Sequence, residues 1–339
     1  MEFISKLINP GSAAVVLLGA FFITFVGYCL GRISIKGVSL GTAGVFLIAL
    51  LFGYLFTLPG LQEIPVLSKF FIENASVPAM DTYGFIGDIG LVLFVTAVGS
   101  IAGPNFFRDL KKNAKTYLPM GAIIIIIGAG VAAAFALIPG IGSAFASGVL
   151  SGALTSTPAF SAAKEIAGEN EAMVALGQAI SYPFGVVGVV LFVQIMPKIL
   201  KVDIDKERES FVAAAAVEIK KDEKKYKQLD PFGFFPFFLT IALGCVIGAI
   251  KIPGINFSLG TSGGTLVAGL IIGHFGHIGG IDLSVNKNAL NFFRELGLML
   301  FLIGAGVAGG AKFVEYFQAI YFVYGVVMTI IPMIAGFLF

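Results

Sequence analysis

The chain has 339 residues, of which 57% are hydrophobic and 12% are charged, and its formal net charge is +2. Together with a mean hydropathy of +0.96, this composition excludes an ordinary soluble protein and indicates an integral membrane protein. The small net charge gives no sign of a nucleic-acid partner.

Apolar segments recur along the whole chain, and several approach the length of about 20 residues that a bilayer requires. The ten segments lie near residues 13–30, 39–58, 84–103, 117–138, 144–163, 173–197, 232–250, 260–279, 293–311 and 317–338. We interpret the first as a retained span, because Arg32 follows it and no small-residue cleavage site does. The predicted fold class is therefore an all-α integral membrane protein.

Two sequence patterns occur twice in the same order. SLGTAG at 39–44 recurs as SLGTSG at 258–263, and DIGLVLF at 88–94 recurs as ELGLMLF at 295–301. Order and residue type are both kept, which predicts an internal duplication. We expect a first transmembrane repeat, a linker and a second transmembrane repeat. These units cover residues 1–200, 201–231 and 232–339.

The basic residues of the loops predict the topology. The linker holds eight lysine or arginine residues, and the loops at 31–38 and 104–116 are also basic. Basic loops favour the cytoplasmic side, so the N-terminus is expected outside. The linker is cytoplasmic only if the segment at 144–167 enters the membrane and returns to the same face. The first repeat then has five true spans, and the second is inverted. This is the plan of inverted-repeat secondary transporters with broken helices, with an elevator-type arrangement as an option.

The re-entrant segment contains the stretch SGALTSTPAFSAA at 151–163. Thr157 followed by Pro158 is typical of an N-cap and the first helical residue. We expect the N–H groups of Ala159, Phe160 and Ser161 to face a ligand, since a helix N-terminus binds carboxylates. The alternative is that the hydroxyl groups merely satisfy a kink.

A second predicted break, Tyr182-Pro183, lies in the following span and would supply polar groups to the same cavity or simply bend the helix. The residues predicted to bind substrate are Thr155, Ser156, Thr157, Pro158, Ala159, Phe160, Ser161, Gln178, Tyr182 and Pro183. With no lysine or arginine deep in the apolar segments, the helix dipole and the hydroxyl groups, or a coupling ion, would recognise an anion.

Secondary candidates come from the repeated patterns. Asp88 and Glu295 are the matched acids of the two copies, and acids inside a membrane are functional candidates. Both also begin their apolar runs, where an acid facing water is ordinary. Ser262, Gly263 and Gly264 follow the second SLGT pattern, and helix packing is the alternative role for such small residues.

Neither a metal nor an organic cofactor is expected. His274 and His277 share a helix end without a third ligand, and Cys29 and Cys245 lie within apolar segments. The coupling ion, Na⁺ or H⁺, stays open.

These landmarks together resemble the aspartate:alanine exchanger family of bacteria, the AspT-like and YidE/YbjL-like transporters. The stretches that carry the resemblance are SLGTAG at 39–44, GDIGLVLFVTAVGSIAG at 87–103, SGALTSTPA at 151–159, SYPFGVVG at 181–188, SLGTSGG at 258–264 and ELGLMLFLIGAGVAGG at 295–310. The resemblance implies a secondary transporter of small carboxylates or amino acids. Exchange of aspartate for alanine and export of succinate-like dicarboxylates are the family's themes.

The sequence departs from the family pattern in two places. Family members usually carry paired TrkA-C-type domains between the halves, whereas about 30 residues stand there in this chain. By analogy with the first copy, the Thr/Ser-Pro break of the second repeat is expected near position 362, beyond Phe339. We therefore expect the second repeat to be incomplete at its C-terminal end.

The sequence predicts a transporter without enzymatic activity, and the resemblance implies an exchanger that works as a homodimer in the bacterial inner membrane. The alternatives are a passive channel built on broken helices and a membrane receptor without flux. An enzyme would need a titratable constellation at depth, which the sequence does not offer.

Overall fold

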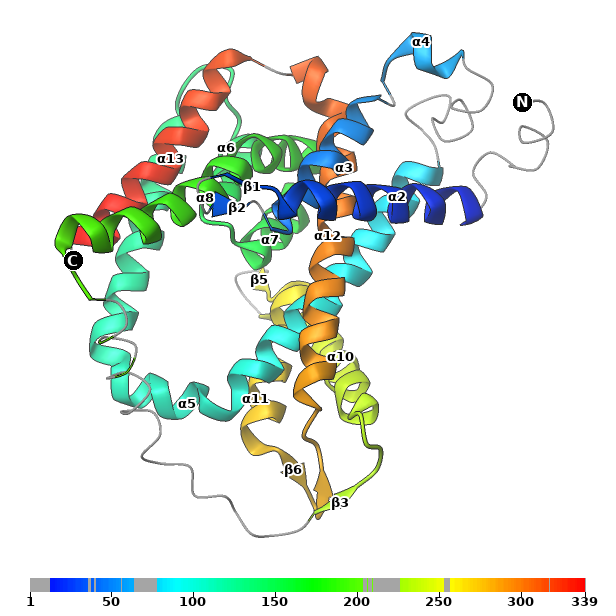
Figure 1. Ribbon diagram of the computed structural model, residues 1–339, viewed down its shortest axis with the longest axis vertical. Helices are drawn as coiled ribbons and strands as arrows, with labels where there is room; N and C mark the ends of the chain where they lie inside the picture. Colours follow the sequence, from blue (N-terminus) through cyan, green and yellow to red (C-terminus); the bar gives the residue numbers. More distant parts are fainter. Residues whose placement is uncertain are drawn as a thin grey trace.

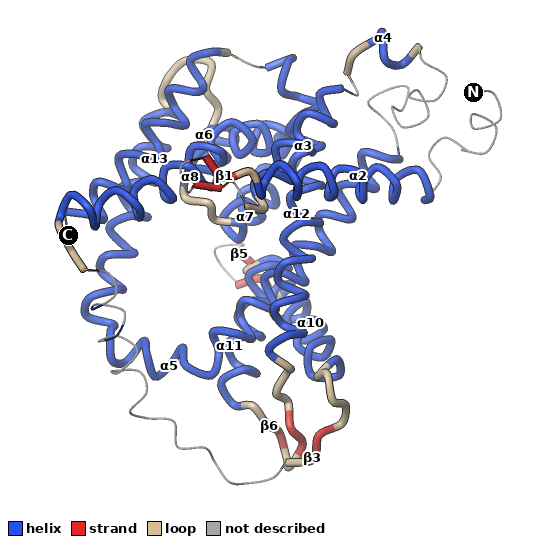
Figure 2. The backbone as a smooth tube through the Cα atoms, viewed as in Figure 1, coloured by secondary structure: helices blue, strands red, loops and turns tan. Residues whose placement is uncertain are grey.

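Helices dominate the part of the chain that the structure, a computed structural model, describes: residues 13–35, 38–39, 41–55, 57–63, 78–203, 206, 209, 226–252, 257–316 and 318–338. The described helices contain five windows long and apolar enough to cross a bilayer, and two of these windows lie within one long helix. These windows are Val15–Arg32, Thr82–Phe107, Ala114–Ala136, Lys287–Ala311 and Ile320–Leu338. The predicted all-α membrane fold is confirmed, and Figure 2 shows how little strand accompanies the helices.

The first SLGT pattern lies in a helical hairpin. Helices α2 (Ala13–Arg32) and α3 (Ala43–Leu55) are joined by the two-residue antiparallel strands β1 (Ser34–Ile35) and β2 (Val38–Ser39). Gly31 lies so close to the Gly41 backbone that a side chain on Gly31 would overlap it. Small residues thus let the two helices meet at their connection. The short helix α4 (Pro59–Gln62) follows.

The second SLGT pattern forms the same local structure. Helices α10 (Phe234–Ala249) and α11 (Gly260–Phe275) are joined by antiparallel strands β4 (Lys251–Ile252) and β5 (Phe257–Ser258). Gly248 lies against the Gly260 backbone as Gly31 lies against Gly41. The duplicated sequences therefore fold alike locally, while their inverted relation in a membrane stays a prediction.

Helix α5 (Pro78–Ala136) is longer than predicted. The sequence indicated two spans separated by a basic loop at 104–116. The prediction of a loop is wrong, because α5 continues through these residues as a helix. Lys111 and Lys115 are exposed, so a polar helical surface serves where a loop was expected. Pro104 and Pro119 lie inside α5, which changes direction in Figure 1, and prolines commonly cause such bends.

Helix α12 (Lys287–Tyr316) crosses the first part of α5 at the centre of the molecule. The contact is reciprocal: a side chain on Gly90 would lie 2.6 Å from the Gly297 carbonyl oxygen, and one on Gly297 would lie 2.7 Å from the Gly90 carbonyl oxygen. Each hairpin packs on the long helix of the other half of the chain: α3 packs on α12, and α11 packs on α5. The four elements therefore share one interior.

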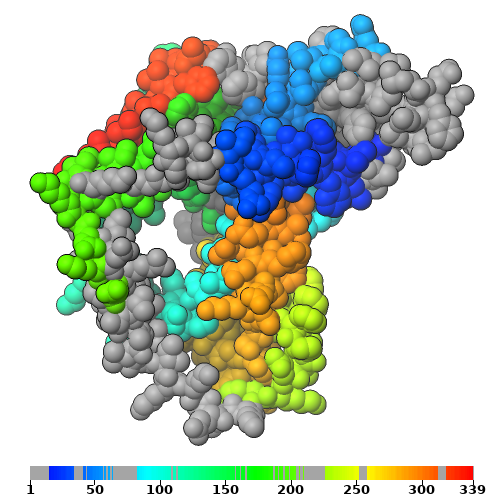
Figure 3. All heavy atoms as spheres, viewed as in Figure 1, coloured from blue at the N-terminus to red at the C-terminus, as the bar shows by residue number. Residues whose placement is uncertain are grey.

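The remaining helices form a second group. Helices α6 (Ser143–Ala153), α7 (Thr157–Ala167) and α8 (Glu171–Leu200) pack together, with the 3₁₀ turn η2 (Gly168–Asn170) before α8. Helix α13 (Ala319–Leu338) lies along α8 and α5. Figure 3 shows the molecule hollowed between α5, α8 and α12 on the side viewed.

A small sheet stands apart from the helices, at the lower end of the view in Figure 1. It contains β3 (Lys227–Gln228), β6 (His277–Ile278) and β7 (Ile281–Asp282), in the order β3-β7-β6. His274 contacts the Phe107 ring, whereas His277 contacts the Tyr226 ring. The two histidines thus have separate aromatic partners.

Asp230 caps the start of α10. Its carboxylate accepts hydrogen bonds from the N–H groups of Phe235, Phe234, Gly233 and Phe232, and these bonds hold its pKa below the ordinary value. A lowered pKa means that the stabilisation is complete above the unfolded-state pKa of about 3.9 and is lost as the pH falls through the folded-state pKa.

The Asp230→Ala variant is therefore expected to melt at a lower temperature than the unmodified protein at pH 7, because α10 loses its cap. The gap should shrink as the pH falls below about 4. Melting curves in detergent across this pH range measure it, with Glu169→Ala at an exposed acid as control. A gap independent of pH would show that the carboxylate charge does not contribute.

Candidate functional site

The predicted break is present between α6 and α7. Helix α6 ends at Ala153, α7 begins at Thr157, and residues 154–156 are not helical. Thr155 has a φ of 50°, a left-handed conformation that is rare for a β-branched residue. The Ser156 N–H donates to the Ser151 carbonyl at 2.8 Å, which closes the turn.

Helix α7 returns the chain toward the start of α6. Gly148 lies against Val174, Gly152 lies against Ser181, and Gly185 lies against Ala153. Residue numbers on α6 and α8 thus rise together, so these two helices run parallel. Since α8 begins level with α6, α7 must run the opposite way between them. The turn that the loop charges required is present in the fold, and its position in a membrane stays a prediction.

The helix cap differs from the prediction. Ser156, not Thr157, is the N-cap of α7. Its hydroxyl oxygen accepts the Ala159 N–H at 3.3 Å, and its carbonyl accepts the Phe160 N–H at 3.0 Å. Two of the three N–H groups predicted to face a ligand are therefore already hydrogen bonded. The sequence prediction was wrong here because the turn places the cap one residue earlier.

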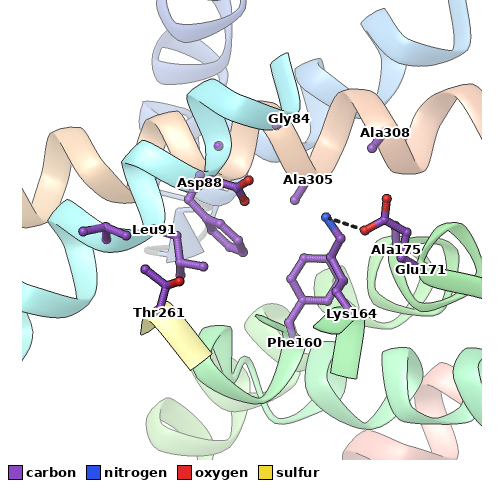
Figure 4. A pocket seen from close by; sticks show the side chains of 14 residues that line it. Gly84, Asp88, Leu91, Phe160, Lys164, Glu171, Ala175, Thr261, Ala305 and Ala308 are labelled. Atoms are coloured by element: carbon purple, nitrogen blue, oxygen red, sulfur yellow. Dashed lines mark ion pairs between the residues drawn. The ribbon is translucent and has the colours of Figure 1, made fainter. Parts of the chain in front are cut away.

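A cavity of about 310 Å³ opens where α7 and the start of α8 face α5, α11 and α12. Polar and apolar atoms contribute nearly equally to its exposed wall, and Figure 4 shows the lining side chains. The lining residues are Gly84, Gly87, Asp88, Leu91, Val92, Phe160, Lys164, Glu171, Ala175, Thr261, Phe301, Gly304, Ala305 and Ala308.

Three charged side chains share this cavity. The Lys164 ammonium lies 3.4 Å from the Glu171 carboxylate and 6.0 Å from the centre of the Phe160 ring. Asp88 stands on the opposite wall, on α5, and interacts electrostatically with both. Phe160 itself is buried against Phe301. The cavity therefore presents a cation and two carboxylates beside apolar side chains.

Comparison with known proteins decides the family. A family model described as "Predicted Permease Membrane Region" matches residues 19–198 and 236–339, which is most of the chain. The chain belongs to this permease family. The resemblance to the aspartate:alanine exchangers is thereby confirmed.

Curated relatives of the permease region are named as transporters. It is 36% identical over 187 residues to "Uncharacterized transporter BF2680" of Bacteroides fragilis, a match covering 55% of this chain and 30% of the relative. It is 37% identical over 175 residues to "Uncharacterized transporter RB4869" of Rhodopirellula baltica, covering 51% and 28%. The matched part spans about a third of the length of these relatives. The family and these relatives are transporters and not enzymes, as the sequence predicted.

Among the ten residues predicted to bind substrate, Phe160 lines the cavity of the permease region. Gln178 is buried and accepts a hydrogen bond from the Ser151 hydroxyl at 2.8 Å, so it joins α6 to α8. Tyr182 is buried against the Phe46 ring at 5.0 Å. Helix α8 continues through Pro183, so the chain is not interrupted there, and a bend is the alternative compatible with this structure.

The secondary candidates differ in whether they line the cavity. Asp88 lines the cavity, whereas Glu295 pairs with the neighbouring Arg294 at 2.8 Å. Ser262 is buried in α11, and Gly264 lies against the α10 backbone. Gly263 faces Leu259 of its own first turn. The packing alternative therefore describes Gly264 better than a binding role does, whereas the contact of Gly263 supports neither role.

The sequence missed Lys164 and Glu171. Both lie just beyond the apolar run at 144–163, at the point where a hydropathy window ends. The available signal was helical spacing, since Lys164 stands four residues after Phe160 and shares its helix face. Lys164 lies outside the apolar segments in sequence, but the return of the chain along α7 brings it to the cavity.

Proposed function

We propose that this protein is a secondary active transporter that exchanges small carboxylates or amino acids, such as aspartate and alanine or succinate-like dicarboxylates. The substrate site of the proposal is the cavity between α5, α7, α8, α11 and α12. One observation carries it: Lys164 faces this cavity at the end of a broken, returning helix pair. Its ammonium group is a partner for a substrate carboxylate.

The size and lining of the cavity support this proposal. Its volume of about 310 Å³ lies at the lower end of the range for small-molecule sites. Clefts that combine apolar and aromatic side chains with a small number of charged or polar groups are typical of such sites. The strained Thr155 at the turn also supports a functional role, since such strain collects at ligand clamps and switches.

The duplicated hairpins and the reciprocal contact of Gly90 with Gly297 support an inverted-repeat arrangement. In the proposal, the N-terminus lies outside, the linker at 201–231 lies in the cytoplasm, and residues 144–167 form a re-entrant pair in the bacterial inner membrane. Residues 1–200 and 232–339 are the two repeats. A homodimer and a coupling ion, Na⁺ or H⁺, complete the proposal.

Counterflow tests exchange directly. Proteoliposomes loaded with unlabelled L-aspartate are expected to take up labelled L-aspartate or L-alanine transiently above the equilibrium level, because exchange uses the outward gradient. Succinate loading tests the dicarboxylate branch, and empty liposomes are the control. Uptake that only equilibrates would indicate a channel, and binding without uptake would indicate a receptor. Neither result is compatible with an exchanger.

A further inference from the structure

Lys164 has a carboxylate partner within its own wall of the cavity. Its Nζ atom lies 3.4 Å from Oε2 of Glu171, and the short turn η2 separates their helices. The two side chains differ in exposure: 32% of Lys164 and 58% of Glu171 are accessible. Figure 4 shows Lys164 directed toward Glu171, with Asp88 across the cavity.

We infer that Glu171 is an internal competitor of the substrate: its carboxylate occupies Lys164 when no substrate is bound, and a substrate carboxylate displaces it. The inference rests on the proposed function and assigns Glu171 a role in setting affinity. No covalent step is involved, since one carboxylate replaces another on the same ammonium group.

Because the Lys164–Glu171 pair is exposed, replacing the Glu171 carboxylate by a substrate carboxylate costs little free energy. Water competes with an ion pair that is one-third to more than half exposed, so the pair itself contributes little to stability. Lys164 also contacts the Phe160 ring, which belongs to the buried interior and holds the ammonium at the cavity wall. The more exposed Glu171 is therefore the partner that can turn away.

Glu171 has a second favourable position once it leaves Lys164. It is the first residue of α8, and a carboxylate in the first turn of a helix is stabilised by the helix dipole. The carboxylate therefore stays near the partial positive charge at the N-terminus of α8 while it faces water. Asp88 is not equivalent, because it belongs to α5 on the other wall and has no such turn beside it.

The competing explanation is that the Lys164–Glu171 ion pair serves only to hold α7 against α8, as a structural staple. A staple predicts that removing Glu171 destabilises the protein and leaves Lys164 no better available to a ligand. Competition predicts tighter ligand binding whenever Lys164 is present. The two roles therefore differ in the sign of the effect on affinity.

The experiment measures binding of L-aspartate and of succinate to the purified full chain by calorimetry in detergent. Glu171→Gln is expected to lower the dissociation constant of the bound probe by about threefold, the size that an exposed ion pair allows. Glu169→Gln, two residues earlier and exposed, should leave it unchanged. In the Lys164→Met background, Glu171→Gln should have no effect on any residual binding. Melting curves without probe accompany each variant.

Weaker or unchanged binding in folded Glu171→Gln overturns the inference, as does tighter binding that persists without Lys164. A lowered melting temperature with unchanged affinity would identify the staple. Each of these outcomes overturns only the role of Glu171. The proposed exchange function would still stand, because the unmodified protein would still exchange substrate. If the unmodified protein neither binds nor exchanges either probe, the proposed function fails, and this inference fails with it.

Discussion

Gly297→Ala is expected to destabilise the protein strongly, because the new methyl group has no room at the crossing of α5 and α12. The added Cβ would lie 2.5 Å from the Phe94 nitrogen and 2.7 Å from the Gly90 carbonyl oxygen. Both are backbone atoms, so relief requires moving one helix. Overpacking of this kind costs about 1–3 kcal/mol or more. Thermal unfolding in detergent and the yield of monodisperse protein measure the effect.

Gly130→Ala is the matched control. It makes the same change inside α5 at a position where nothing lies within 4 Å of the added Cβ. Alanine favours a helix over glycine by about 1 kcal/mol, so this variant should be as stable as the unmodified protein or more so. Equal melting temperatures for Gly297→Ala and Gly130→Ala would mean that the described crossing is not tight.

Lys164→Met is expected to reduce carboxylate binding and exchange by at least about tenfold, the size of one lost charge-assisted hydrogen bond. Methionine keeps much of the length and apolar contact of the side chain but removes the charge. Counterflow and calorimetry with L-aspartate and succinate measure the loss. Lys164→Arg, which keeps the charge with a different shape, should retain part of the activity.

Lys115→Met controls for the removal of a positive charge elsewhere in the chain, since Lys115 is exposed on α5 and outside the cavity. It should exchange substrate normally. Normal exchange by folded Lys164→Met would remove the cavity from consideration as the carboxylate site. Loss of exchange in both variants would indicate a general charge effect instead.

Local pattern was enough to predict several elements of the fold. The SLGT echoes predicted a duplication, and both copies form a helical hairpin with the same glycine contact. The TSTP stretch predicted a helix break, which lies at residues 154–156. Both features depend on residues close together in the chain, so the sequence contains their cause.

The errors arise where one local pattern is compatible with two structures. The stretch at 104–116 reads as a loop because it is basic, yet basic residues are also compatible with an exposed helical surface, as Lys111 and Lys115 show. Pro183 reads as a break, but α8 tolerates it, as membrane helices can when neighbouring groups compensate. Hydropathy does not distinguish these outcomes.

The candidate site was predicted in its region and in part of its residues, since the predicted Phe160 and Asp88 line the cavity. The sequence directed attention to the start of α7, whereas two of the three charged groups that line the cavity, Lys164 and Glu171, lie further along the chain. Their position follows from the reversal of direction in α7, which the contacts between α6 and α8 impose. The position of a charged side chain in the cavity can thus depend on a turn of the chain, and its neighbours in sequence do not reveal it.

The parallel packing of α6 and α8 divides the cavity into two sides. Lys164 and Glu171 belong to a three-helix unit in which Gly148 and Gly152 lock α6 onto α8 by backbone contact. Asp88 belongs to the α5 and α12 crossing, locked in the same way by Gly90 and Gly297. A molecule that bridged Lys164 and Asp88 would therefore span two helix groups, each held by its own glycine contacts and packed against the other in one shared core.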